Sequence, residues 1–152
     1  MTDLVFTPLD EVGLSTLRSW FSDPELRHRF EYPTDTWFDY VSNRPNVRAW
    51  MIREDDLPVG QFQLDIETDQ TGYIGFYVKP ELRNQGYGKW MLRNFLARPE
   101  VGSLDRIVAT AEVDNLASQH CLVGVGFTLE RGKPDEEGFL HYVYNVTKAT
   151  DS

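Results

Sequence analysis

The stretch at residues 78–89 reads Val78-Lys79-Pro80-Glu81-Leu82-Arg83-Asn84-Gln85-Gly86-Tyr87-Gly88-Lys89 and contains two glycines between charged residues. The residues up to Val78 predict a strand, and a helix is predicted directly after the loop, from Tyr87 to Ala97. The first turn of a helix has unpaired backbone N–H groups, and glycines allow an anion to approach them closely. Arg83 and Lys89 add positive charge on either side. The stretch therefore predicts a binding site for a phosphate group.

The charge of the chain is concentrated in segments that differ in sign. The 152 residues include 15 Lys+Arg and 24 Asp+Glu, which gives a net charge of −9. Residues 76–98 hold one acidic and five basic residues, whereas residues 1–75 hold 14 acidic and six basic ones and residues 99–152 hold nine and four. The only net-positive segment thus contains the predicted phosphate loop. The acidic remainder repels nucleic acid, which is not expected as a partner.

Length and composition indicate one soluble globular domain over residues 1–152. Cys121 is the only cysteine, which is typical of a reducing compartment. The N-terminus has no basic, apolar leader, and no run of 18 apolar residues occurs, so we expect a cytoplasmic protein that does not associate with membranes.

The order of the predicted elements is that of an α/β domain with a mixed, mostly antiparallel sheet. A short strand and three short helices come first, two hairpins follow, and a helix, a strand, a helix and a last hairpin complete the chain. The predicted strands are residues 4–6, 47–53, 59–67, 73–78, 106–111, 127–131 and 139–146. Five helices are predicted. The first begins at Leu14, the second contains Leu26 and Phe30, and the third begins at Trp37. The last two cover residues 87–97 and 117–123.

Two nucleotide-binding motifs that also contain glycines do not fit the loop. A Walker loop ends in Gly-Lys-Ser/Thr, but Trp90 follows Gly88-Lys89. A dinucleotide fingerprint needs a third glycine where this chain has Met91.

The pattern that does fit is R-x-x-G-x-G, formed by Arg83, Gly86 and Gly88. It resembles motif A of the GNAT superfamily of acyl-CoA-dependent N-acetyltransferases, and residues 75–80 before it resemble the fourth strand of that family.

A second stretch is similar to motif B of the same family. It consists of Asn115-Leu116-Ala117-Ser118, followed by Gly126-Phe127 at the expected separation. The two motifs together span residues 73–131. The early helices, with Trp20, residues 22–25 and Trp37, resemble the branch that contains ribosomal-protein N-terminal and aminoglycoside 6'-N-acetyltransferases.

The resemblance implies a GNAT-type fold with an acyl-CoA cleft between the fourth and fifth strands. It also implies that acetyl-CoA is the cosubstrate, that a primary amine is the acceptor, and that a homodimer can form. No metal is expected, because the three histidines are widely spaced and form no ligand pair. The cofactor-binding residues that the resemblance implies are Phe76, Tyr77, Val78, Arg83, Asn84, Gln85, Gly86, Tyr87, Gly88, Lys89 and Asn115.

The catalytic residues are where this chain departs from the family pattern. Many members have a glutamate base two residues before the glycine of the fourth strand, and a tyrosine acid seven residues after the motif B asparagine. Here these positions hold Tyr73 and Leu122. The candidates for proton transfer are Tyr73, Asp65, Glu67 and Glu112, and positioning alone is a further alternative. The neighbouring His120 and Cys121 are also considered, although a thiol of ordinary pKa is a poor acid toward another thiol.

The leading hypothesis is acetyl transfer from acetyl-CoA to a small cationic amine, an aminoglycoside or a peptide N-terminus. The acidic flanking segments favour such a cationic acceptor. The alternative from another functional class is a CoA-binding sensor or interaction module that has lost catalysis. Transfer of a longer acyl chain is a further enzymatic alternative.

Overall fold

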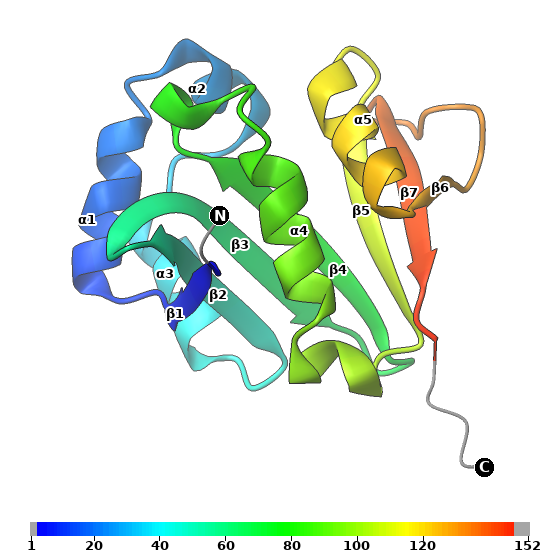
Figure 1. Ribbon diagram of the computed structural model, residues 1–152, viewed down its shortest axis with the longest axis horizontal. Helices are drawn as coiled ribbons and strands as arrows, with labels where there is room; N and C mark the ends of the chain where they lie inside the picture. The colour runs from blue at the N-terminus through cyan, green and yellow to red at the C-terminus, as the bar shows by residue number, and fades with distance from the viewer. Residues whose placement is uncertain (1–2, 148–152) are drawn as a thin grey trace. The chain divides into compact units, whose positions relative to one another are not determined.

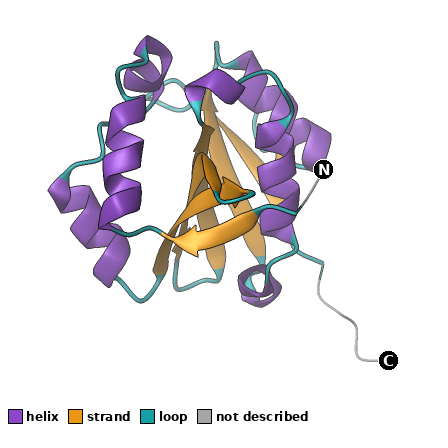
Figure 2. Cartoon of the chain, turned by 60° about the vertical axis from the view of Figure 1, so that its left-hand side comes forward, coloured by secondary structure: helices purple, strands orange, loops and turns teal. Residues whose placement is uncertain are grey.

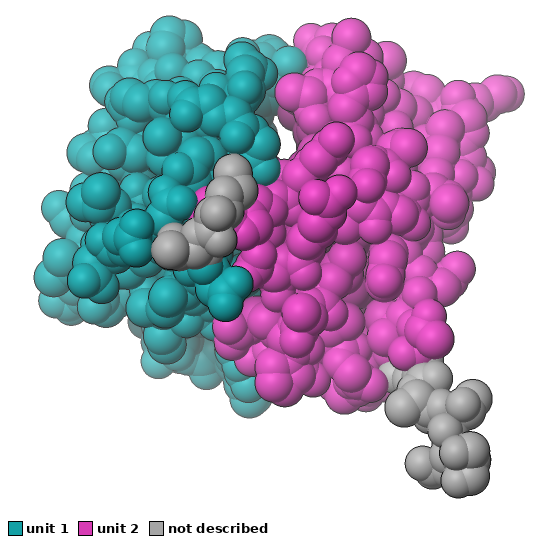
Figure 3. Space-filling model, viewed as in Figure 1, with its two compact units in different colours: residues 1–64, 76–87 teal, residues 65–75, 88–152 magenta. Residues whose placement is uncertain are grey.

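The computed structural model describes residues 3–147, and these residues fall into two compact units (Figure 3). Unit 1 takes the chain up to Leu64 and residues Phe76–Tyr87. Unit 2 takes residues Asp65–Gly75 and the chain from Gly88 onward. The single-domain organisation expected from the length stays a prediction.

The elements follow the predicted α/β order (Figures 1 and 2). The strands within the described residues form one mixed sheet in the order β1-β2-β3-β4-β5-β7-β6, in which β4 and β5 are parallel. The predicted fold class is therefore confirmed. The strands are β1 Val5–Pro8, β2 Val47–Glu54, β3 Leu57–Ile66, β4 Thr71–Val78, β5 Arg106–Glu112, β6 Thr128–Leu129 and β7 Phe139–Asn145. The α-helices are α1 Glu11–Trp20, α2 Pro24–Arg29, α3 Asp35–Asn43, α4 Tyr87–Leu96 and α5 Leu116–Val125, and two short 3-10 helices are η1 Pro80–Leu82 and η2 Pro99–Ser103.

Each of the three early helices begins at a side chain that accepts a hydrogen bond from the first turn. Asp10 accepts from the backbone N–H of Gly13, which is why α1 begins three residues before the predicted Leu14. Asp23 caps α2 in the same way, with Pro24 as the first helical residue, and Thr34 caps α3. Polar caps therefore fix where these helices begin.

The expected strand at residues 127–131 is wrong in its length, because the structure has only the two-residue β6 there. Gly126 ends α5 with a φ of 115°, and the N–H of Phe127 donates to the carbonyl of Leu122. The backbone N–H of Phe127 thus closes the helix and is not available for pairing with a neighbouring strand, so the strand begins only at Thr128.

Glu67 was predicted at the end of a strand, but the structure places it in the turn between β3 and β4. Its N–H donates to the carbonyl of Thr71, and its carbonyl accepts from the N–H of Gln70. Gln70 adopts a φ of 64°, which reverses the chain. Both backbone groups of Glu67 therefore close the turn.

The core of unit 1 lies on both faces of β2. On one face, Val47, Ala49 and Met51 belong to a cluster with residues of α1, α2 and α3, which are blue to cyan in Figure 1. On the other face, Phe62 of β3 contacts the rings of Phe6, Trp50 and Phe76. These ring contacts connect β1, β2, β3 and the final residues of β4.

Unit 2 is centred on β5, which is paired on both sides. Residues Thr71–Ile74 of β4 are in parallel register with Arg106–Ala109, and β7 pairs with all of β5 in the antiparallel direction. Beyond that register, β4 continues to Val78 and β5 to Glu112. The ring of Phe127, at the end of α5, packs on Tyr144 of β7 at 5.3 Å between centroids.

Replacing Phe62 by alanine tests the aromatic contacts that hold β4. Because Phe62 is fully buried and stacks on Phe76 at 5.2 Å, we expect Phe62→Ala to lower the free energy of unfolding by about 3–5 kcal/mol. Urea denaturation measures the change. Leu57→Ala is the control, because Leu57 is on the same strand and 68% exposed. Equal stability losses in the two variants would contradict the assignment of Phe62 to the core.

Candidate functional site

The loop before α4 has the backbone conformation of an anion-binding site. Asn84 and Gly86 adopt φ values of 61° and 88°, both in the left-handed region. A Cβ atom added at Gly86 would meet no atom within 4 Å, so this side of the loop is open. The first N–H groups of α4 have no partner within the helix. The loop therefore fits a pyrophosphate group, which can approach the backbone at the position where glycine removes the side chain.

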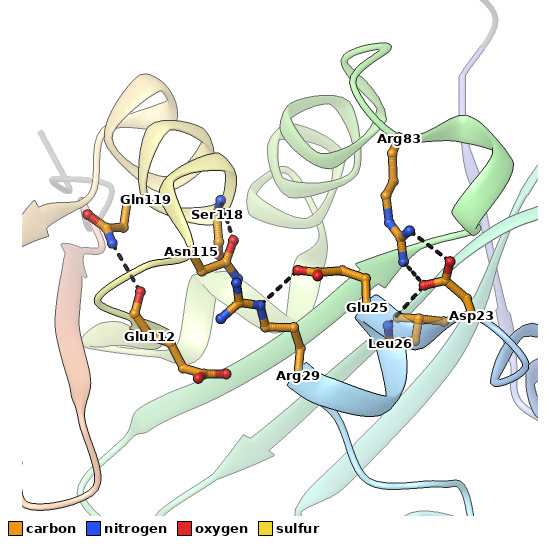
Figure 4. A network of polar contacts seen from close by, with 9 residues as sticks. All are labelled: Asp23, Glu25, Leu26, Arg29, Arg83, Glu112, Asn115, Ser118 and Gln119. Carbon is orange, nitrogen blue, oxygen red and sulfur yellow. Dashed lines mark hydrogen bonds and ion pairs between the residues drawn. The ribbon is translucent and has the colours of Figure 1, made fainter.

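Two carboxylates of unit 1 hold this loop near its ends. Arg83 donates to both carboxylate oxygens of Asp23, with 3.1 Å between Nη1 and Oδ1 (Figure 4). The hydroxyl of Tyr87 donates to Oε1 of Glu54 at 2.6 Å. The guanidinium holds the pKa of Asp23 below its usual range, and the bond to Glu54 raises the pKa of Tyr87.

The Asp23 and Glu54 contacts were not predicted from the sequence. The helix cap at Asp23 is a local feature of the sequence, but the partner of its carboxylate, Arg83, is 60 residues away. No local pattern marked Glu54, which ends a strand. Long-range contacts between side chains, such as this ion pair and the Tyr87–Glu54 hydrogen bond, leave no spacing in the sequence that could identify them.

Lys89, which follows the R-x-x-G-x-G motif directly, lies against α5 within unit 2. A Cβ atom at Gly124 would stand 2.8 Å from Cε and 2.9 Å from Nζ of Lys89. The absence of a side chain at Gly124 thus makes room for the lysine. The ammonium group is also near enough to Cys121 to act on its pKa, in the lowering direction.

The residues at the end of β4 bury their side chains in unit 1. Phe76 stacks on Phe62, and the ring of Tyr77 packs against Trp20, Phe21 and Phe30. Burial raises the pKa of Tyr77, so its hydroxyl stays protonated at neutral pH. With both side chains fixed in the protein, the backbone of this segment is the part suited to binding a ligand.

Asn115 combines a structural role with a donor that is available to a ligand. Its Oδ1 accepts from the N–H of Ser118 at 3.3 Å and caps α5 (Figure 4). Among residues 3–147, no acceptor for its Nδ2 group is found. This group can therefore donate to the cofactor, as the motif B resemblance implies.

The four predicted catalytic residues are all in unit 2, on separate segments. Tyr73 is 42% exposed on β4 and is in register with Val108 of β5. Glu112 follows four residues later on β5, so it shares a face of the sheet with Tyr73. Asp65 is half-buried near the end of β3, and Glu67 is exposed in the turn that follows. Of the four candidates, Tyr73 and Glu112 are therefore the two that the β4–β5 register places on the same face of the sheet.

Two of the α5 residues at or beside the position where many family members have a tyrosine are buried, namely Cys121 and Leu122. Leu122 is 1% exposed and belongs to the core. Burial raises the pKa of Cys121 to about 11, although the charges of Lys89 and Arg93 act in the opposite direction. A thiol with this pKa is a weaker acid than an ordinary thiol. His120 is exposed on the same helix.

A pocket of about 480 Å³ lies beside the C-terminal end of α2 in unit 1. It is lined by Phe21 and by residues 27–32, which include Arg27, His28, Arg29 and Glu31. Arg29 is paired with Glu25 one turn earlier at 2.9 Å (Figure 4). The pocket therefore combines aromatic rings with charges of both signs.

Neither a metal cluster nor a membrane span is found in the part of the chain that the structure describes. Within residues 3–147, no three His, Cys, Asp or Glu side chains are grouped so that they could hold a metal ion. No helix there is long and apolar enough to cross a membrane.

Comparison with known proteins agrees with the geometry of the loop. The model of the acetyltransferase (GNAT) family matches residues 14–127. A relative from Bacillus subtilis (strain 168), the uncharacterized N-acetyltransferase YfmK, is 34% identical over 137 residues, which cover 89% of this chain and 92% of the relative.

Solved acetyltransferase structures share the fold. The aminoglycoside acetyltransferase AAC(6')-Ib in complex with paromomycin and acetyl-CoA superposes with a TM-score of 0.78 at 18% identity, covering 95% of this chain and 94% of that one. RimL, a ribosomal L7/L12 alpha-N-protein acetyltransferase, gives a TM-score of 0.80 at 20% identity, covering 96% and 92%. With both motifs, the loop geometry and the family match in agreement, the chain is an acyltransferase that belongs to the GNAT family of acetyltransferases.

Proposed function

We propose that this enzyme transfers the acetyl group of acetyl-CoA to a primary amine in a ternary complex. The observation that carries the proposal is the open backbone at Gly86, in the only net-positive segment of the chain. That loop fits the pyrophosphate of coenzyme A. Membership of the acetyltransferase family supports the same cosubstrate.

Three groups of residues are proposed to bind acetyl-CoA. The backbone N–H groups from Arg83 to Lys89, including those of Asn84, Gln85, Gly86, Tyr87 and Gly88, hold the pyrophosphate. The backbone of residues 76–78 pairs with the pantetheine arm in the manner of an added strand. The Nδ2 group of Asn115 donates to the cofactor.

The proposed reaction forms a bond between the amine nitrogen and the acetyl carbonyl carbon and breaks the carbon–sulfur bond, so that CoA leaves as a thiolate and the amine loses a proton. The residues of this chain contribute mainly by fixing the two reactants next to each other. Tyr73, Asp65, Glu67 and Glu112 remain candidates for accepting the proton. The buried Cys121 is not suited to protonate the thiolate, because its pKa is raised to about 11.

The acceptor is proposed to be a cationic amine: a small polyamine-like molecule, an aminoglycoside or a peptide N-terminus. The net negative charge of the segments on both sides of the cofactor loop supports this class. The names of the similar structures, an aminoglycoside and a ribosomal-protein acetyltransferase, support the last two. The proposal also includes a cytoplasmic location, an ability to form homodimers, a metal-free mechanism and no nucleic-acid partner.

The experiment that tests this function is a steady-state assay with acetyl-CoA and a panel of amines. Thiol release that depends on one class of amine supports the proposal and identifies the acceptor. Propionyl- and butyryl-CoA in the same assay determine whether a longer acyl chain is preferred.

A CoA-binding sensor is the second candidate, favoured by the buried Leu122 and the exposed Tyr73 at the two positions where many members of the family have an acid and a base. It predicts CoA binding without thiol release for any amine in the panel. That result would contradict the enzymatic proposal while leaving the cofactor site intact.

Alanine at Gly86 is expected to weaken CoA binding specifically. An L-residue is strained at its φ of 88°, and its Cβ would occupy the open side of the loop. Gly138→Ala is the matched control, because Gly138 has a φ of 90° and equally open surroundings but lies in the turn before β7. We expect the CoA dissociation constant to rise about tenfold or more in Gly86→Ala alone, as measured by isothermal titration calorimetry. Equal changes in both variants would mean that the loop does not contact CoA.

The pH dependence of the reaction tests whether a dedicated base is needed. If positioning dominates, kcat/KM rises with pH as the amine itself deprotonates, up to the ordinary amine pKa of about 10. Tyr73→Phe and Glu112→Gln should keep this profile and lower kcat less than about tenfold. A loss of about a hundredfold in either variant, with loss of the pH dependence, would instead identify that residue as the base.

A further inference from the structure

The pairing of Asp23 with Arg83 uses both oxygens of one carboxylate and crosses 60 residues of sequence. Arg83 donates through Nη1 and Nη2, so the contact is bidentate (Figure 4). The side chains of Arg83 and Asp23 are 32% and 21% exposed, which shields the pair partly from solvent. Bidentate guanidinium–carboxylate contacts fix orientation as well as distance.

The same carboxylate holds the N-terminus of α2. Oδ2 of Asp23 accepts from the N–H of Leu26 at 3.0 Å, and the N–H of Asp23 donates to the carbonyl of Trp20 at 3.1 Å. Asp23 therefore connects three parts of unit 1: the end of α1, the start of α2, and the first residue of the R-x-x-G-x-G motif. The pocket beside residues 27–32 lies at the other end of α2, which is six residues long.

Arg83 is, in consequence, not a freely available cation. Its planar group already has a carboxylate partner, and its pKa is raised by that partner. The loop instead offers its backbone, which is open at Gly86. The side chain of Arg83 thus fixes the loop to Asp23, whereas the backbone of the loop is the part open to a ligand.

We propose that Asp23 and Arg83 are a positioning pair. In this pair the side chain of Arg83 orients the cofactor loop and does not bind phosphate, and Asp23 holds the start of α2 in a fixed position relative to that loop. The inference rests on the proposed function, because it concerns affinity for CoA. Its consequence is that removing the charge of Asp23 weakens CoA binding although Arg83 is still present. If Arg83 were itself a phosphate ligand, releasing it from Asp23 would leave CoA binding unchanged or make it tighter.

Asp23→Asn is the variant that separates these outcomes. Asparagine caps a helix as well as aspartate does, so α2 is retained while the ion pair is lost. We expect the CoA dissociation constant, measured by calorimetry, to rise about threefold to tenfold, with a similar rise in KM for acetyl-CoA.

Asp35→Asn is the matched control, because it removes a carboxylate from the exposed Arg18–Asp35 pair. It should leave CoA affinity unchanged. In the double variant Asp23→Asn/Arg83→Ala, CoA affinity should match that of Arg83→Ala alone, since both changes remove one interaction. Circular dichroism and the melting temperature show whether each variant is folded.

The outcomes distinguish the inference from the proposed function. Unchanged or tighter CoA binding by Asp23→Asn, or additive losses in the double variant, would overturn the positioning role while CoA binding by the unaltered enzyme stands. Absence of CoA binding by the unaltered enzyme would overturn the proposed function itself.

Discussion

The unpaired backbone N–H groups at the start of α4 are the feature on which anion binding by this loop depends. They are useful to an anionic ligand only if the loop keeps one conformation, and that conformation includes two residues with positive φ. Such a backbone costs about 1 kcal/mol or more for a residue other than glycine. The surroundings must therefore hold it. Asp23 and Glu54 do this from opposite ends of the loop, and the aromatic contacts of Phe76 and Tyr77 fix the strand that leads into it.

The chain is acidic as a whole, but the segment that contains the loop is net positive. A net charge of −9 by itself argues against any phosphate-containing partner. Helix N-termini and backbone amides act over a few ångströms, however, so a single basic segment is sufficient for one pyrophosphate. The acidic segments remain suited to attracting an amine. The pairing of Arg83 with Asp23 further means that the positive charge nearest the loop is partly neutralised within the protein.

Local signals in the sequence were enough to predict the order of elements, the α/β class and the loop that joins β4 to α4. Caps at Asp23 and Thr34, the glycines at 86 and 88, and alternating apolar residues all act within a few positions of each other. The strand at β6 was predicted too long because the backbone N–H of Phe127 donates to Leu122 at the C-terminal end of α5 instead of pairing with another strand. The hydrophobicity of Phe127 does not distinguish between these two arrangements. The partners of Arg83 and Tyr87 could not be predicted, because they are 60 and 33 residues away. The raised pKa of Cys121 likewise depends on burial in the folded chain.

The loop at Gly86 is proposed to bind the pyrophosphate of coenzyme A. Calorimetric titration of the unaltered enzyme with CoA and with pantetheine, which lacks the pyrophosphate and the nucleotide, measures the affinity that these groups contribute. Two or more charge-assisted hydrogen bonds to the pyrophosphate should make CoA bind at least about a hundredfold more tightly than pantetheine. That difference should shrink as salt is added. Equal affinities for the two ligands, at low and at high salt, would contradict the account.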